Sequence, residues 1–322
     1  MTDRILSLLE FEYGIVSNSV IPASGGFSTK ASYRITDVNG SEYFLKIYDK
    51  SLPTTRLFVE RIDAYMPVLA WLSASTSLQG RILTPVSAKE GAYKIEKYGD
   101  VFVLFLYVRG AVPGIQNITR KQTMELAEIL ALLHEISETV PFETHGLAED
   151  VSLSFCGRLV RFLNNMSLES KSLFDVVSPH LGFLLEAAHE TLRLRDTLRL
   201  SHTPLVLCHG DAHGNNVIQS ERLVLADWEE LRWAPVEAEL FIHAWHPYGS
   251  TLLETYVTIR RDYCVNNEML YFYILRRRLE DIWGDIQRLT EESPNETESV
   301  ELLSYIQQSI DGVQALFQQH QK

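Results

Sequence analysis

Cysteines are few in this sequence, and it has no long uncharged run. Its 322 residues include only three cysteines, Cys156, Cys208 and Cys264, which lie far apart and form no CxxC pair. A disulfide scaffold or a zinc knuckle is therefore disfavoured, and a reducing cytoplasm is the expected location. The longest uncharged run, 64–80, is too short and too polar to span a bilayer, and the N-terminal segment is a poor signal peptide.

Positive charge is also scarce. The sequence has 29 Lys and Arg against 42 Asp and Glu, a net charge of -13, and the whole excess lies after Val108. We therefore expect neither nucleic acid nor a membrane as the main partner, because an acidic surface favours cationic or magnesium-bound small molecules. The uneven charge, with Gly and Pro clustered in 108–118, predicts two domains, 1–108 and 109–322.

Local patterns predict a β-rich first third followed by helices. Segments 31–36 and 42–48 are rich in β-forming residues and flank an Asn-Gly turn, and the apolar run 101–108 predicts a buried strand. A helix is expected from about Thr54 to Trp71, kinked or ended early by Pro67. Further helices are expected at 152–166, 181–198, 250–265 and 268–290, and short strands at 205–208 and 223–226.

The densest polar cluster runs from Cys208 to Asn216, as CHGDAHGNN, directly after an apolar run. Asp227 follows eleven residues later, again after a short apolar run, so a hairpin would bring Asp211, Asn216 and Asp227 together. Phosphoryl transfer needs such a set, with one carboxylate for the hydroxyl proton and a carboxylate and an amide oxygen for magnesium. Asp211 and Asn216 also have the spacing of the protein-kinase catalytic loop.

Residues 209–216, followed by Asp-Trp-Glu at 227–229, resemble the signature of the aminoglycoside phosphotransferase and choline kinase superfamily. Segment 126–134 is similar to a helix of that superfamily, and 228–235 and 278–282 resemble its spectinomycin phosphotransferase branch. The resemblance implies a two-lobed, protein-kinase-like α+β fold, with a small antiparallel sheet and one helix in the N-terminal lobe and a mainly helical C-terminal lobe. It also implies an enzyme that uses ATP and Mg²⁺ to phosphorylate a hydroxyl of a small molecule.

The same resemblance implies roles for individual residues. Asp211 would be the catalytic base, and Asn216 and Asp227 would hold magnesium. Lys46 would hold the α- and β-phosphates, with Glu60 as its helix partner, although Asp63 one turn away competes for that role. The nucleotide loop would comprise Ser24, Gly25, Gly26 and Phe27, and the hinge that meets adenine would comprise Phe105, Leu106 and Tyr107. The sequence departs from protein kinases in lacking both GxGxxG and DFG.

The sequence leaves alternatives open for the acceptor molecule and for the class of reaction. The branch resemblance and the acidic charge suggest an aminoglycoside or aminocyclitol antibiotic, with Glu229 and Glu230 near Asp211, and also Asp281, as candidate partners of its ammonium groups. Kinases of choline, homoserine, a sugar or a macrolide share the motif. A nucleotide-binding module without catalysis is another alternative, and the protein could be a monomer or a homodimer. A metal-dependent hydrolase would instead use His209, Asp211, His213 and Asp227.

Overall fold

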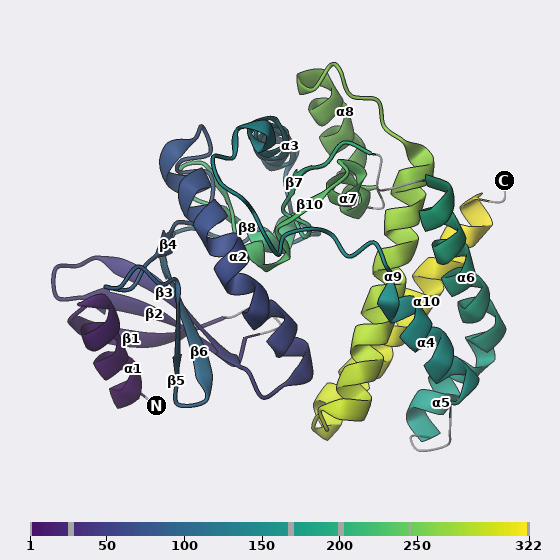
Figure 1. Ribbon diagram of the computed structural model, residues 1–322, viewed down its shortest axis with the longest axis horizontal. Helices are drawn as coiled ribbons and strands as arrows, with labels where there is room; N and C mark the ends of the chain where they lie inside the picture. The colour runs from purple at the N-terminus through teal and green to yellow at the C-terminus, as the bar shows by residue number, and fades with distance from the viewer. Residues whose placement is uncertain (1, 25–28, 167–170, 199–202, 245, 321–322) are drawn as a thin grey trace. The chain divides into compact units, whose positions relative to one another are not determined.

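The computed structural model describes residues 2–24, 29–166, 171–198, 203–244 and 246–320 (Figure 1). The chain forms two compact units, each made of two stretches of sequence. The first unit comprises Met1–Ala148 and Leu205–Cys264, and the second comprises Glu149–Pro204 and Val265–Lys322. These two units are a division by compactness and differ from the lobes expected at 1–108 and 109–322, which stay a prediction.

An antiparallel sheet forms the N-terminal part of the first unit. Its strands are β1 (Ser17–Ala23), β2 (Ala31–Asp37), β3 (Glu42–Asp49), β4 (Pro85–Val86), β5 (Lys94–Lys97) and β6 (Asp100–Leu106). Their order is β1-β2-β3-β6-β4, and β5 also pairs with β6. The expected hairpin joins β2 to β3, where Gly40 has φ 84° and the Asp37 carboxylate accepts the N–H groups of Asn39 and Ser41 at 2.9 and 2.7 Å.

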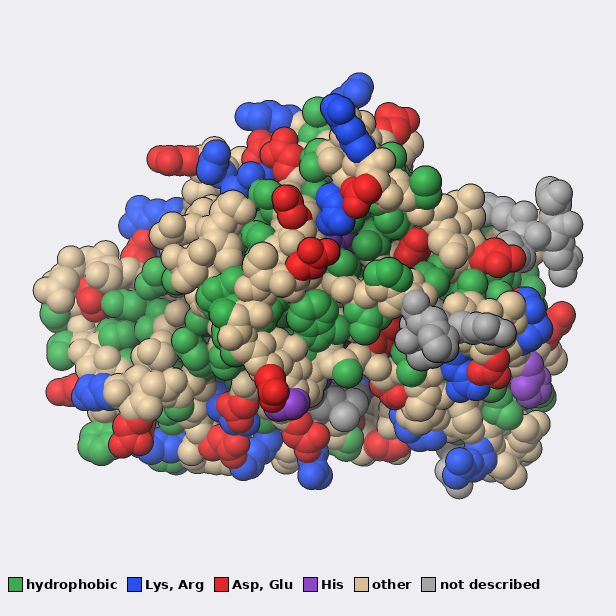
Figure 2. Space-filling model, turned by 45° about the horizontal axis from the view of Figure 1, so that its top comes forward, with side chains coloured by type: hydrophobic (Ala, Val, Ile, Leu, Met, Phe, Trp, Pro, Cys, Tyr) green, Lys and Arg blue, Asp and Glu red, His purple; other side chains and the backbone are tan. Residues whose placement is uncertain are grey.

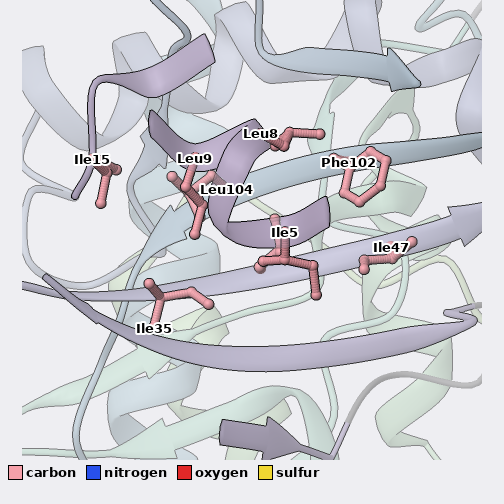
Figure 3. Packing of buried hydrophobic residues seen from close by; sticks show 9 residues of the cluster. Ile5, Leu8, Leu9, Ile15, Ile35, Ile47, Phe102 and Leu104 are labelled. Carbon is pink, nitrogen blue, oxygen red and sulfur yellow. The ribbon is translucent and has the colours of Figure 1, made fainter. Parts of the chain in front are cut away.

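One face of this sheet is covered by the N-terminal helix α1 (Thr2–Leu8) and the π-helical turn η1 (Leu9–Tyr13), neither of which was predicted. Figure 3 shows the two layers of this core. The buried side chains are Ile5, Leu8, Leu9 and Ile15 from the N-terminal segment, and Ile35, Leu45, Ile47, Phe102 and Leu104 from the sheet. Because side chains alternate along a strand, Lys46 and Tyr48 point to the opposite face of β3.

Helix α2 (Pro53–Ser75) runs through Pro67, so of the two effects expected of this proline, a kink or an early end, the early end was wrong. Proline removes the bond to the carbonyl one turn earlier, here that of Asp63. Pro67 and Asp63 are both exposed, so water can satisfy that carbonyl. Meanwhile the apolar side chains on either side of Pro67, among them Met66 and Val68, are fully buried. Packing of this face therefore outweighs the lost hydrogen bond.

The rest of the first unit carries the polar loops. Its regular elements are α3 (Arg120–Ile136), η2 (Ser137–Thr139), β7 (Val206–Cys208), η5 (Gly214–Asn216), β8 (Val217–Gln219), β9 (Leu223–Leu225), η6 (Trp228–Glu230), β10 (Arg232–Ala234), α7 (Glu237–Leu240), η7 (Phe241–His243) and α8 (Gly249–Ile259). Strand β7 pairs with β10, and β8 pairs with β9. Single bridges join Ile82 to Leu225 and Ala111 to Gln219. The bridge from Ile82, with the Leu83 N–H donating to the Leu225 carbonyl at 3.1 Å, ties the β8–β9 hairpin to the segment before residue 108.

The second unit is helical. Its elements are α4 (Ser154–Asn164), α5 (Lys171–Val177), η3 (Ser178–His180), α6 (Leu181–Leu198), α9 (Asn267–Glu291) and α10 (Glu296–His320). A buried ion pair joins Arg276 of α9 to Glu149 at 2.6 Å, and the Tyr273 hydroxyl donates to the same carboxylate at 2.7 Å. Among the described helices of both units, none combines the length and hydropathy needed to cross a membrane.

Candidate active site

The catalytic-loop motif begins where strand β7 ends at Cys208. Gly210 follows with φ 84°, a conformation that side-chain-bearing residues rarely adopt. A Cβ atom at this position would lie 2.8 Å from the Glu230 carbonyl oxygen and 2.8 Å from Nη1 of Arg232. Residue 210 must therefore be glycine because of its positive φ and because a Cβ atom would clash. Without a side chain at this position, the loop that carries Asp211 can approach the segment after Asp227.

A buried carboxylate holds the backbone of this loop. Glu239, fully buried on α7, accepts the N–H of His209 and the N–H of Gly210, the latter at 3.2 Å. Burial would raise the pKa of Glu239, but the neighbouring histidines, chiefly His134 at 3.9 Å, lower it overall. His134 is itself held by the hydroxyl of Tyr256 at 2.6 Å. Sequence reasoning missed Glu239, since nothing in its spacing relates it to the motif.

His209 connects the two polar loops. Its Nε2 donates to the Ala226 carbonyl at 2.8 Å, and its Nδ1 accepts the Asp211 N–H at 3.2 Å. The ring packs edge-on against Trp228, with centroids 4.6 Å apart. Both ring nitrogens are thus bonded to backbone groups, so His209 does not present the metal ligand that the hydrolase alternative requires.

Asp211 and Asn216 are in direct contact. The Asn216 side-chain N–H group donates to the Asp211 carbonyl at 2.8 Å and to Oδ2 of its carboxylate at 2.9 Å. The short 3-10 turn η5 makes this possible by folding residue 216 back over residue 211. The spacing that suggested a catalytic pair therefore does bring the two side chains together.

The ammonium group of Lys46 lies between two carboxylates. Its Nζ pairs with Oδ1 of Asp227 and, at 2.7 Å, with Oε1 of Glu229. The hydroxyl of Tyr48 donates to the same Glu229 oxygen. Asp227 has φ 68°, a left-handed conformation that turns the chain sharply between β9 and η6. The sequence did not predict the contact between Asp227 and Lys46, and Tyr48 and Glu229 complete the group.

Burial and charge act against each other at this group. Burial alone would lower the pKa of Lys46, but the Glu229 and Asp227 carboxylates outweigh it and raise that pKa. Burial also opposes ionisation of Asp227, yet Lys46 holds the pKa of this carboxyl well below its usual range. The pKa of Glu229 is raised by burial and by the adjacent Asp227 carboxylate, with Lys46 opposing. Lys46 and Asp227 are therefore an ion pair, and Glu229 is the easier carboxylate to protonate.

Four predicted residues have partners other than the expected ones. The Glu60 carboxylate pairs with Arg56 at 2.8 Å on the exposed side of α2, and Asp63 pairs with Lys94 at 2.7 Å. Neither contacts Lys46, so the expected helix partner of this lysine was wrong in both forms. Glu230 pairs with Arg232 at 3.1 Å, and Glu229 is buried against Lys46. These two acids are thus engaged within the chain, which does not favour their expected role as ammonium ligands.

The expected nucleotide loop and hinge are only partly visible. Ser24 is exposed after β1, whereas Gly25, Gly26 and Phe27 lie outside the described residues. Phe105 is buried near the end of β6. The N–H groups of Leu106 and Tyr107 donate to the carbonyls of Thr84 and Glu42 at 2.9 and 3.0 Å. A purine at this hinge would therefore bind to backbone groups other than these two donors.

The sheet, the helical segments and the catalytic loop define a two-lobed, protein-kinase-like α+β fold, as expected. The chain belongs to the phosphotransferase enzyme family, whose model matches residues 19–269, and it is a phosphotransferase. No curated protein matches the sequence.

Three solved structures resemble the chain over nearly its whole length. Spectinomycin phosphotransferase APH(9)-Ia, in complex with ADP and spectinomycin, is 20% identical with a TM-score of 0.67, over 98% of both chains. A microcompartment-associated aminopropanol kinase is 16% identical with a TM-score of 0.65, over 96% of this chain and 95% of the other. Amicoumacin kinase hAmiN, bound to AMP-PNP, Ca²⁺ and Ami, is 14% identical with a TM-score of 0.63, over 96% and 93%.

Proposed function

We propose that the protein transfers the γ-phosphoryl group of ATP to a hydroxyl of a small cationic molecule in the cytoplasm. The observation that carries this proposal is the arrangement of Lys46, Asp227, Asn216 and Asp211 within one compact unit. Phosphoryl transfer uses a lysine for the phosphates, an acid and an asparagine for the metal ion, and a further acid for the acceptor hydroxyl. The nucleotides bound to the similar phosphotransferases support ATP as the donor.

The donor set suits a magnesium–nucleotide complex. The low pKa of Asp227 keeps its carboxylate ionised. The amide nitrogen of Asn216 donates to Asp211, so the amide oxygen of Asn216 is the atom suited to bind a hard cation. Asn216 and Asp227 would hold Mg²⁺, which when bound neutralises phosphate charge. Lys46 would bind the α- and β-phosphates, exchanging part of its contact with the carboxylates. Asp211 would orient the acceptor hydroxyl and take its proton.

Charge supports a cationic acceptor. On the face drawn in Figure 2, acidic side chains lie interspersed with basic ones, so the acidic excess of the chain is not gathered into one area there. Helix α9 nevertheless carries Asp281 and Asp285 one turn apart. Burial and the Asp281 carboxylate raise the pKa of Asp285 to about 7, and burial also raises the pKa of Asp281 although Arg277 pairs with it at 2.9 Å. The excess of 42 acidic over 29 basic residues in the whole chain is therefore the charge argument for a cationic acceptor.

An aminocyclitol or aminoglycoside is the acceptor class we favour, because the similar spectinomycin phosphotransferase spans the same length. The aminopropanol and amicoumacin kinases show that relatives with this fold act on other small molecules. Choline, homoserine, sugars and macrolides therefore belong in the same test.

A coupled ADP-release assay with MgATP and a panel of these acceptors tests the proposal. We expect acceptor-dependent ADP release by the unmodified chain and almost none by Asp211→Asn, which keeps the shape of the side chain but cannot accept the proton. Phosphate release without any acceptor, at equal rates in both proteins, would overturn it.

A further inference from the structure

His213 contacts two different parts of the catalytic loop through its two ring nitrogens. It is the N-cap of the 3-10 turn η5, and its Nδ1 accepts the Asn215 N–H at 3.3 Å. Its backbone carbonyl accepts the Asn216 N–H at 2.8 Å. Because Nδ1 is the acceptor, a neutral ring carries its proton on Nε2.

That Nε2 lies 3.5 Å from Oδ2 of Asp211. The separation is longer than a typical N–H···O hydrogen bond, and such contacts often shorten once substrates bind. Asn216 donates to the same Oδ2 at 2.9 Å. Asn216 therefore holds this oxygen by a hydrogen bond, and the His213 Nε2 lies beside the same oxygen, where a shortened contact would add a second donor and restrict rotation of the carboxylate about the Cβ–Cγ bond.

We propose that His213 is a positioning residue, which turns the Asp211 carboxylate so that Oδ1 is presented to the acceptor hydroxyl. The inference rests on the proposed function, since it assumes that Asp211 is the base. His213 has two separable tasks. Through Nδ1 it caps the turn that carries Asn216, and through Nε2 it orients Asp211.

The two tasks can be separated by substitution. His213→Asn retains a side-chain oxygen that caps the turn, because asparagine is among the best N-cap residues. The shorter side chain cannot reach Asp211. His213→Ala removes both contacts. The pair therefore distinguishes a role in orienting the base from a role in bracing the loop.

Turnover is measured with MgATP and spectinomycin, and MgADP affinity and melting temperature are measured without acceptor. We expect kcat to fall about tenfold in both variants, as one hydrogen bond to a charged group allows. His213→Asn should keep the melting temperature and MgADP affinity of the unmodified chain. In an Asp211→Asn background, His213→Asn should cause no further loss of residual turnover. Unchanged kcat in His213→Asn, or an equal loss in both backgrounds, would overturn the proposal.

A second measurement does not depend on the acceptor. Nitrogen-15 NMR of the full chain should show His213 as the Nε2–H tautomer, with an Nε2–H signal that shifts in Asp211→Asn. The Nδ1–H tautomer, or a signal unaffected by Asp211→Asn, would refute the positioning role even if spectinomycin is not a substrate. Absence of turnover by the unmodified chain would count only against the proposed acceptor.

Discussion

Replacing Glu229 by glutamine should destabilise the first unit, because its carboxylate is one of the two that Lys46 contacts. The substitution keeps an oxygen for the Tyr48 hydroxyl but removes the charge. Removing one partner of a buried ion pair costs about 3–5 kcal/mol. Since Asp227 remains beside Lys46 and the glutamine oxygen can still accept, we expect about half of that, about 2 kcal/mol.

Thermal unfolding followed by circular dichroism can measure this loss. For a unit of this size, 2 kcal/mol corresponds to a melting temperature lower by about 4–8 °C. Glu230→Gln is the matched control, because the neighbouring carboxylate is part-exposed and pairs with Arg232 at 3.1 Å and Arg61 at 3.6 Å. Surface pairs of this kind contribute about 0–1 kcal/mol. Equal melting temperatures for the two variants would refute the reasoning that Glu229 is the second partner of Lys46.

Further predictions concern the loop, the protonation of a buried histidine and the core. Gly210→Ala should lower the free energy of unfolding by at least 1–2 kcal/mol, because alanine disfavours φ 84° and its Cβ would meet the Glu230 carbonyl; a denaturant midpoint equal to that of the unmodified chain would contradict this. Burial lowers the pKa of His243 from 6.5 to about 3, although the Glu239 carboxylate opposes this shift. Between pH 6.5 and pH 3 the His243 imidazole is therefore protonated in the unfolded chain and neutral in the folded chain. The free energy of unfolding should fall as the pH decreases below 6.5. The loss should be about 2 kcal/mol from pH 7 to pH 5, and His243→Phe should remove it; the same pH slope in that variant would exclude His243 as the source. Leu45→Ala should lower the free energy of unfolding by about 2–5 kcal/mol, because it leaves a cavity between the sheet and α1. A decrease below about 1 kcal/mol in chemical unfolding would show that this core is loosely packed.

The contact between Asp211 and Asn216 could be predicted from the sequence because it is local. Asp211 and Asn216 are five residues apart, and the 3-10 turn between them suffices to bring their side chains together. Asp227 follows a short hairpin whose strands were visible as apolar runs. The apolar neighbours of Lys46 likewise indicated that its side chain is buried.

The partners of Lys46 could not be predicted in the same way. Which acid reaches it depends on how α2 is rotated, and the buried stripe containing Ile62, Tyr65 and Leu69 leaves Glu60 exposed. Glu229 takes its place through a contact across 183 residues of sequence. The sequence did contain a signal that could have placed Tyr48 in this group. Tyr48 lies two residues after Lys46, and residues two apart on a strand share one face of the sheet.

The division into units was also beyond local reasoning. Composition changes near residue 108, but the bridge from Ile82 to Leu225 joins segments on both sides of that residue within one compact unit. Such pairings join distant segments and have no signature in charge or turn residues. Glu239 was missed for a similar reason, because only the folded chain brings it to the loop backbone.

The most direct test of the phosphotransferase mechanism separates nucleotide binding from chemistry in Asp211→Asn. Calorimetric MgATP affinity and acceptor-dependent turnover should be measured on the same preparation. We predict an affinity within about twofold of that of the unmodified chain and a turnover lower by about 10²–10⁴, the usual contribution of a general base. Turnover retained in full would contradict the assignment of Asp211.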